Sequence, residues 1–83
     1  MDETTELKRL RWQCRRGMKE MDALLLAWLE RGWPTAEAAQ REAFRTLLTV
    51  EDDVLWAWLS GRRRPESAEL AAMVDAIHAL GPA

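Results

Sequence analysis

Two side chains in this sequence carry the nucleophilic or metal-binding chemistry of an active site, Cys14 and His78. A histidine base can activate a cysteine nucleophile, and both side chains also bind zinc. Each type occurs once, so no set of nucleophile, base and orienting residue can be placed, and a metal site needs more ligands. We therefore predict no catalytic residue, no metal site and no enzyme activity. Cys14 is expected to be a small buried side chain and His78 a solvated one.

The length and composition indicate a small intracellular domain. A chain of 83 residues fits one domain with one core, over residues 1–83, with about 1–4 and 80–83 frayed. The single cysteine excludes an internal disulfide and fits a reducing compartment. No apolar run reaches the roughly 20 residues that span a membrane, and the acidic start resembles neither a signal peptide nor a transit peptide. We expect a protein of the bacterial cytoplasm without membrane insertion.

The charges are distributed unevenly along the chain. The formal net charge of −2 does not favour a dedicated nucleic-acid binder, so no nucleic-acid partner is predicted. One basic cluster lies near the start and a second near residue 63, made up of Lys8, Arg9, Arg11, Arg15, Arg16 and Lys19, and of Arg62, Arg63 and Arg64. A basic-patch module that binds RNA or an acidic protein therefore remains an alternative, and its affinity would fall steeply with salt.

Helical periodicity fits the whole chain, and strand alternation fits none of it. We predict an all-α fold, a compact bundle of about five short helices with short connections. The expected pieces are Thr5–Arg16, Met18–Arg31, a third capped by Thr35, a fourth opened by a capping box at Thr49–Asp52, and a fifth opened by Ser67. Glycine at positions 17, 32 and 61 ends the first, second and fourth pieces.

The apolar positions indicate which side chains form the core. The centre of the second piece is apolar nearly all round, which is typical of the buried middle of a bundle. In the third piece the residues expected to point inward are Ala39, Ala43, Phe44, Leu47 and Leu48. Of the five tryptophans, Trp28 and Trp58 fit core positions, whereas Trp12, Trp33 and Trp56 are less constrained.

The stretch Arg16–Glu20 has two interpretations. Basic residues in a last helical turn and an acid in the next first turn are favoured by the helix dipoles, so a structural account covers them. Alternatively the stretch is a functional loop. Trp12 also has two interpretations. It lies between Lys8 and Arg16 on a helical wheel, so it is either an interface anchor or half of a cation–π pair.

The ordered residues of this stretch resemble a known family. Arg16, Gly17 and Glu20 match its Arg-Gly-x-x-Glu motif, and the segment after it contains Met21-Asp22 followed by three leucines. A second segment matches at Leu47-Leu48, Leu55 and Trp58-Leu59, although Asp52-Asp53-Val54 stands where members commonly have Asp-Pro-Asp. From Leu7 to Ile77 the chain resembles the SdhE/succinate dehydrogenase assembly factor 2 family of flavinylation factors.

The resemblance implies a five-helix chaperone without turnover chemistry. Such a protein binds the flavoprotein subunit of succinate dehydrogenase, or of fumarate reductase, and promotes covalent attachment of FAD to a histidine of that subunit. FAD then belongs to the partner, and this chain binds no cofactor stably. An antitoxin-like or membrane-associated regulator is a further alternative. We expect a monomer, although apolar surface around Trp12 or Trp33 would support a dimer in isolation.

The resemblance also assigns a partner-binding site by carry-over. Gly17 would allow close approach of the partner's backbone, and Arg16 would pair with polar or acidic groups of the partner. Glu20 would either brace the loop or contact the partner. The residues expected to flank this surface are Trp12, Arg15 and Asp22.

Overall fold

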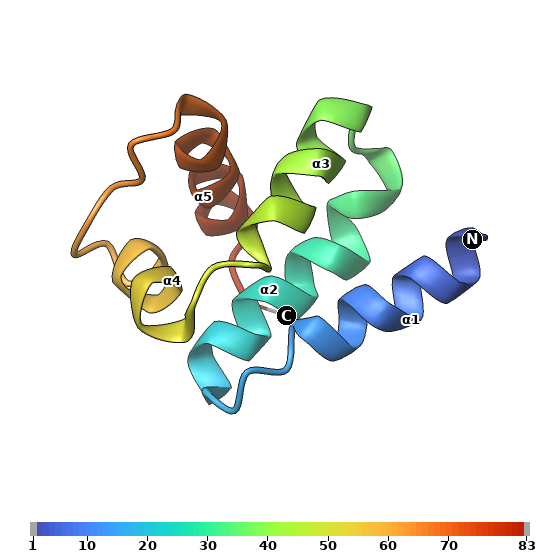
Figure 1. Ribbon diagram of the computed structural model, residues 1–83, viewed down its shortest axis with the longest axis horizontal. Coiled ribbons are helices and arrows are strands. Elements are labelled where there is room, and N and C mark those ends of the chain that lie inside the picture. The colour runs from blue at the N-terminus through green and yellow to red at the C-terminus, as the bar shows by residue number, and fades with distance from the viewer. Residues whose placement is uncertain (1, 83) are drawn as a thin grey trace.

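The computed structural model describes residues 2–82 and is helical, with no strand in that range (Figure 1). Its elements are α1 (Glu3–Gln13), α2 (Lys19–Arg31), the short 3-10 helix η1 (Trp33–Thr35), α3 (Ala38–Leu47), α4 (Asp52–Leu59) and α5 (Ala68–Leu80). The predicted all-α fold of five short helices is confirmed. Met1 and Ala83, which the sequence places in the frayed ends, lie outside the described residues, while Glu3, Thr4 and Leu80 are helical.

The core forms around α2 and α5. Helix α2 packs against α1, η1 and α5, and α5 in turn contacts α3 and α4. The predicted apolar centre of α2 explains this position, because Leu25, Trp28 and Leu29 are all buried. Figure 1 shows α1 running from the edge of the molecule at its N-terminus towards α2. The connection between α1 and α2 lies at the lower edge of that view, and α3 and α5 lie in its upper half.

Several predicted helix ends are wrong, each for a local reason. Helix α1 ends at Gln13 rather than Arg16, because the backbone amide of Arg16 bonds to the Asp22 carboxylate instead of a helical carbonyl. Thr35 does not cap α3, because it belongs to η1; the N-cap is Glu37, whose amide donates to the Gln40 side chain at 3.3 Å.

The start of α4 differs from the prediction and the start of α5 agrees with it. The Thr49 hydroxyl donates to the Thr46 carbonyl at 2.6 Å, so it is not available for a capping box, and the N-cap of α4 is Glu51. The Ser67 hydroxyl oxygen accepts the amide of Leu70 at 3.2 Å, which confirms Ser67 as the N-cap of α5.

Tryptophan placement corrects the predicted core. Trp33 is 1% exposed, and its ring meets Trp28 and Phe44 at centroid distances of 6.3 and 6.2 Å. The 3-10 turn at Trp33-Pro34 directs this side chain inward, which helical periodicity does not show. Trp28 is buried as predicted, whereas Trp58 is only half-buried. In α3, Ala39 is exposed rather than inward, while the other four residues predicted to point inward are buried or half-buried.

Candidate functional site

The connection between α1 and α2, residues 14–18 and here called the Gly17 loop, carries the predicted site. Its first residue, Cys14, has no exposed surface and anchors the loop in the core. Gly17 has a φ of +86°, a conformation that favours glycine, and it is exposed. A Cβ built at Gly17 meets no atom within 4 Å. Nothing inside the described chain therefore restricts the size of a side chain there, and the restriction on Gly17 within the fold is conformational.

Asp22 braces the Gly17 loop from α2. Its Oδ1 accepts the backbone amide of Arg16 at 2.9 Å, and its Oδ2 accepts that of Gly17 at 3.3 Å. A carboxylate in the first turns of a helix also interacts favourably with the helix dipole. Asp22 was predicted to flank the partner surface; within this chain its two oxygens hold the loop backbone.

The Arg16 side chain points into the molecule and is 14% exposed. Its Nε donates to Asp52 Oδ1 at 2.6 Å, and Nη2 donates to the Val50 carbonyl at 2.6 Å. Nη1 donates to the carbonyls of Leu48 at 2.9 Å and Gln13 at 3.2 Å. All three guanidinium nitrogens thus have partners within the chain. The resemblance implied that this group pairs with polar or acidic groups of a partner, and that role stays a prediction. Sequence reasoning missed Asp52, which lies 36 residues away and gives no local signal.

Three of the predicted site residues lie free on the surface beside this loop. Glu20 and Arg15 are exposed, and neither side chain has a hydrogen bond or ion pair within residues 2–82. Trp12 is 76% exposed. The helical-wheel prediction that Arg16 frames its ring is wrong, because α1 ends at Gln13 and the guanidinium turns to Asp52.

A shallow, mostly apolar hollow adjoins Glu20. Its lining consists of Lys19, Glu20, Ala23, Leu24 and Pro82. A free carboxylate at the edge of apolar surface is an arrangement found where protein interfaces pass from core to rim. Glu20 therefore does not brace the loop within the described chain, which leaves contact with a partner as its remaining predicted role.

The two side chains with catalytic potential are held apart from this surface. Burial raises the pKa of the Cys14 thiol to about 12, so the thiol stays protonated at neutral pH. His78 is exposed, as predicted, and its Nε2 also lies 2.6 Å from the Leu59 carbonyl, so the ring links α5 to the end of α4. Among residues 2–82 no three histidine, cysteine, aspartate or glutamate side chains gather into a metal site.

The buried thiol predicts a loss of stability at alkaline pH. Between about pH 9 and 12 the unfolded chain releases the Cys14 proton and the folded chain keeps it, so the free energy of unfolding should fall by about 1.4 kcal/mol per pH unit. The chain has no tyrosine, so no phenol ionises in this window. Urea unfolding at pH 8, 9, 10 and 11 measures the slope. Cys14→Ala should flatten it, and parallel curves for the two proteins would contradict the assignment.

The two basic clusters belong to different parts of the fold. Figure 1 places α1 at one end of the molecule and the α4–α5 connection, which carries Arg62 and Arg63, at the other. Arg64 pairs with Asp75 at 2.7 Å, and this ion pair lowers the pKa of the Asp75 carboxyl.

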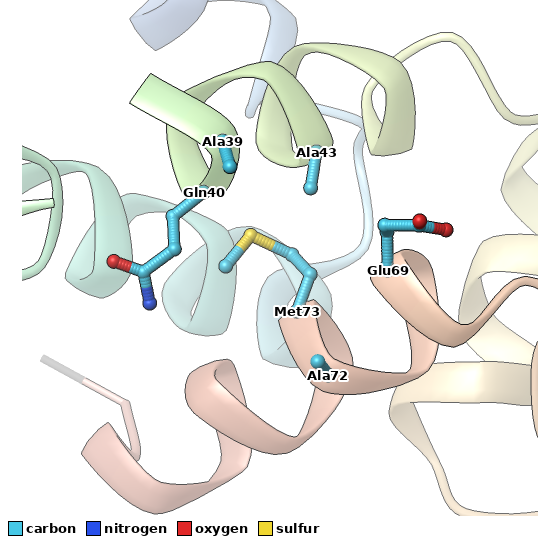
Figure 2. A pocket seen from close by; sticks show the side chains of 6 residues that line it. All are labelled: Ala39, Gln40, Ala43, Glu69, Ala72 and Met73. Carbon is cyan, nitrogen blue, oxygen red and sulfur yellow. The ribbon is translucent and has the colours of Figure 1, made fainter. Parts of the chain in front are cut away.

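The hollow between α3 and α5 has little chemistry (Figure 2). Its lining is Ala39, Gln40 and Ala43 from α3 and Glu69, Ala72 and Met73 from α5. Figure 2 shows the Met73 side chain extending from α5 towards α3, and the residues that line the hollow include no nucleophile. The hollow does not include any residue of the Gly17 loop.

The fold and the loop define a small all-α protein with an exposed glycine loop that is braced from within. The comparisons with known proteins identify the family: the chain belongs to the family described as the flavinator of succinate dehydrogenase, whose model matches residues 8–80. No described helix is long and apolar enough to cross a membrane.

Named relatives of this chain come from several bacteria. It is 45% identical to the FAD assembly factor SdhE of Xylella fastidiosa (strain 9a5c), over 96% of this chain and 82% of the relative. Identity is 43% to the FAD assembly factor SdhE of Pseudomonas aeruginosa, over 93% and 92% of the two chains. It is 42% to that of Methylococcus capsulatus, over 87% of each chain. No solved structure matches the chain.

Proposed function

We propose that this chain is an assembly factor that binds the flavoprotein subunit of succinate dehydrogenase and promotes covalent attachment of FAD to a histidine of that subunit. The observation that carries the proposal is family membership over residues 8–80, since the family is described as the flavinator of this enzyme. The related fumarate reductase subunit is a second candidate client. A cytoplasmic location is part of this proposal.

The proposed mechanism is positioning rather than chemistry by this chain. Flavin and acceptor histidine both belong to the partner, and the bond forms between them there. Holding two reacting groups in a productive geometry can supply several kcal/mol of a barrier without any transferring group. This division of roles fits a chain whose single thiol is buried and protonated.

The contact surface of the proposal is the exposed side of the Gly17 loop and its neighbours. Gly17 presents backbone without a side chain, and Glu20 and Arg15 offer unpaired charges of opposite sign. Trp12 adds a large exposed aromatic ring, a residue type that often dominates the energy of an interface. The free chain is proposed to be monomeric, with this apolar surface covered by the partner.

Covalent flavin on the succinate dehydrogenase subunit provides the test. Denaturing gels remove non-covalent FAD, so the remaining flavin fluorescence of the subunit band measures attachment. Cells lacking this gene should lose most of the signal, and the wild-type chain should restore it. Glu20→Ala should restore less than about a tenth, as expected if the free Glu20 carboxylate is one of the few contacts that dominate binding.

A matched variant on the same helix controls for loss of a surface carboxylate. Glu30 is also exposed on α2, and its side chain has no hydrogen bond within residues 2–82. Glu30→Ala should therefore restore the signal fully. Equal fluorescence with and without the gene would exclude the proposed role for succinate dehydrogenase, and the same gel on fumarate reductase would test the second client.

A further inference from the structure

Arg16 ties together three separate segments of the chain. Its guanidinium bonds to the carbonyl of Gln13 at the end of α1, to the Leu48 and Val50 carbonyls of the α3–α4 connection, and to Asp52 in α4. Carbonyls at the end of a helix lack intrahelical donors, so a planar fork of five N–H groups suits this position. The Asp52 carboxylate, in the first turn of α4, supplies the balancing charge.

These bonds make the guanidinium a poor contact for a partner. The Arg16 side chain is 14% exposed, and contact with another protein would require its Asp52 and carbonyl bonds to break. Charge-assisted hydrogen bonds are among the stronger bonds in proteins, and unpaired buried carbonyls are costly. By contrast, the neighbouring Arg15 is exposed and has no partner in the described chain. Arg16 is therefore bonded within the chain, whereas the neighbouring Arg15 side chain is available to a partner.

We propose that Arg16 is a positioning residue, which clips the Gly17 loop to the α3–α4 connection so that the loop has one shape when a partner approaches. The hydrogen bonds of Arg16 to Asp52, Leu48 and Val50 form this clip. Asp22 fixes the same loop from the other side through the amides of Arg16 and Gly17. The partner then contacts a preformed surface, and the ordering of the loop no longer opposes binding. The binding part of this inference rests on the proposed function.

Asp52→Ala separates positioning from direct contact because the two roles predict different results. If Arg16 positions the loop, removing Asp52 loosens the clip, weakens binding of the flavoprotein subunit by about tenfold and speeds exchange of the Gly17 amide about tenfold. If Arg16 contacts the partner, removing Asp52 frees the guanidinium, and binding stays equal or tightens. Calorimetric titration and amide exchange by NMR measure both quantities.

Further variants complete the test. Arg16→Ala should weaken binding and speed exchange of the Gly17 amide. Arg16→Lys should restore neither the affinity nor the slow exchange, because an ammonium lacks the planar fork. The Arg16→Ala, Asp52→Ala double variant should lose no more affinity than Arg16→Ala alone. Arg15→Ala is the matched control: binding should weaken while exchange at Gly17 stays unchanged. Additive losses in the double variant, or unchanged exchange in Arg16→Ala, would overturn the proposal.

The exchange measurement also separates this inference from the proposed function. If the wild-type chain fails to bind the flavoprotein subunit, the proposed function fails. Amide exchange of the isolated chain still tests whether Arg16 positions the Gly17 loop. Faster exchange at Gly17 in both Arg16→Ala and Asp52→Ala supports this role, and wild-type exchange rates in either variant overturn it.

Discussion

Gly17→Arg is expected to abolish binding to the flavoprotein subunit while the chain remains folded. A Cβ at this position meets no atom of the described chain within 4 Å, so a long side chain extends into solvent. The cost to the isolated protein is the positive φ of +86°, about 1 to 2 kcal/mol for a residue with a side chain. In the proposed complex the same side chain occupies the space of the partner, which should weaken binding at least about a hundredfold. Circular dichroism and calorimetric titration measure the two effects.

A second glycine provides a matched control for Gly17→Arg. Gly61 has a φ of +84° and equally open surroundings, but it follows α4 at a different place in the fold. Gly61→Arg should therefore lose the same stability and keep wild-type affinity. If both variants lose binding equally, the effect is one of added charge or general destabilisation, and the site does not lie at Gly17. If Gly17→Arg unfolds the chain, the glycine is structural.

The sequence predicts helix number and most of the core because apolar periodicity is a local signal that burial rewards. The Ser67 cap and the ends of α2 and α4 at or beside Gly32 and Gly61 follow similarly from single residue types. The burial of Trp33 cannot be predicted from apolar periodicity. Its burial depends on a 3-10 turn that directs the ring towards Trp28 and Phe44, and no spacing within the chain encodes that direction.

The sequence likewise predicts only part of the candidate site. The prediction grouped Trp12, Arg15 and Glu20 with Arg16 and Asp22, and the structure brings all of them to or beside one loop. It also separates them into exposed and bracing residues, which sequence could not do. The distinction for Arg16 depends on Asp52 and on two carbonyls of a distant connection, and these contacts exist only in the folded chain. Long-range pairs of this kind leave no mark in periodicity or motif spacing.

Trp33→Ala is expected to be the most destabilising single truncation among the tryptophans. The ring is 1% exposed, packs against both Trp28 and Phe44, and lies beneath the guanidinium groups of Arg41 and Arg45 at 4.8 and 5.1 Å from its centroid. Removing a buried tryptophan side chain costs about 3 to 5 kcal/mol. A domain of this size has a total stability of about 4 to 12 kcal/mol, so the melting temperature should fall by roughly 15 °C or more.

Trp12→Ala provides the opposite result for the same residue type, and the pair tests the division between core and surface. Trp12 is 76% exposed, so its truncation should change the free energy of unfolding by less than about 0.5 kcal/mol. Binding to the flavoprotein subunit should nevertheless weaken by tenfold or more, because an exposed aromatic anchor contributes only in the complex. Thermal unfolding and calorimetric titration of both variants measure this crossed pattern. A stable Trp33→Ala chain would contradict the fold, whereas a Trp12→Ala chain with wild-type affinity would remove α1 from the proposed surface and confine it to the Gly17 loop and Glu20.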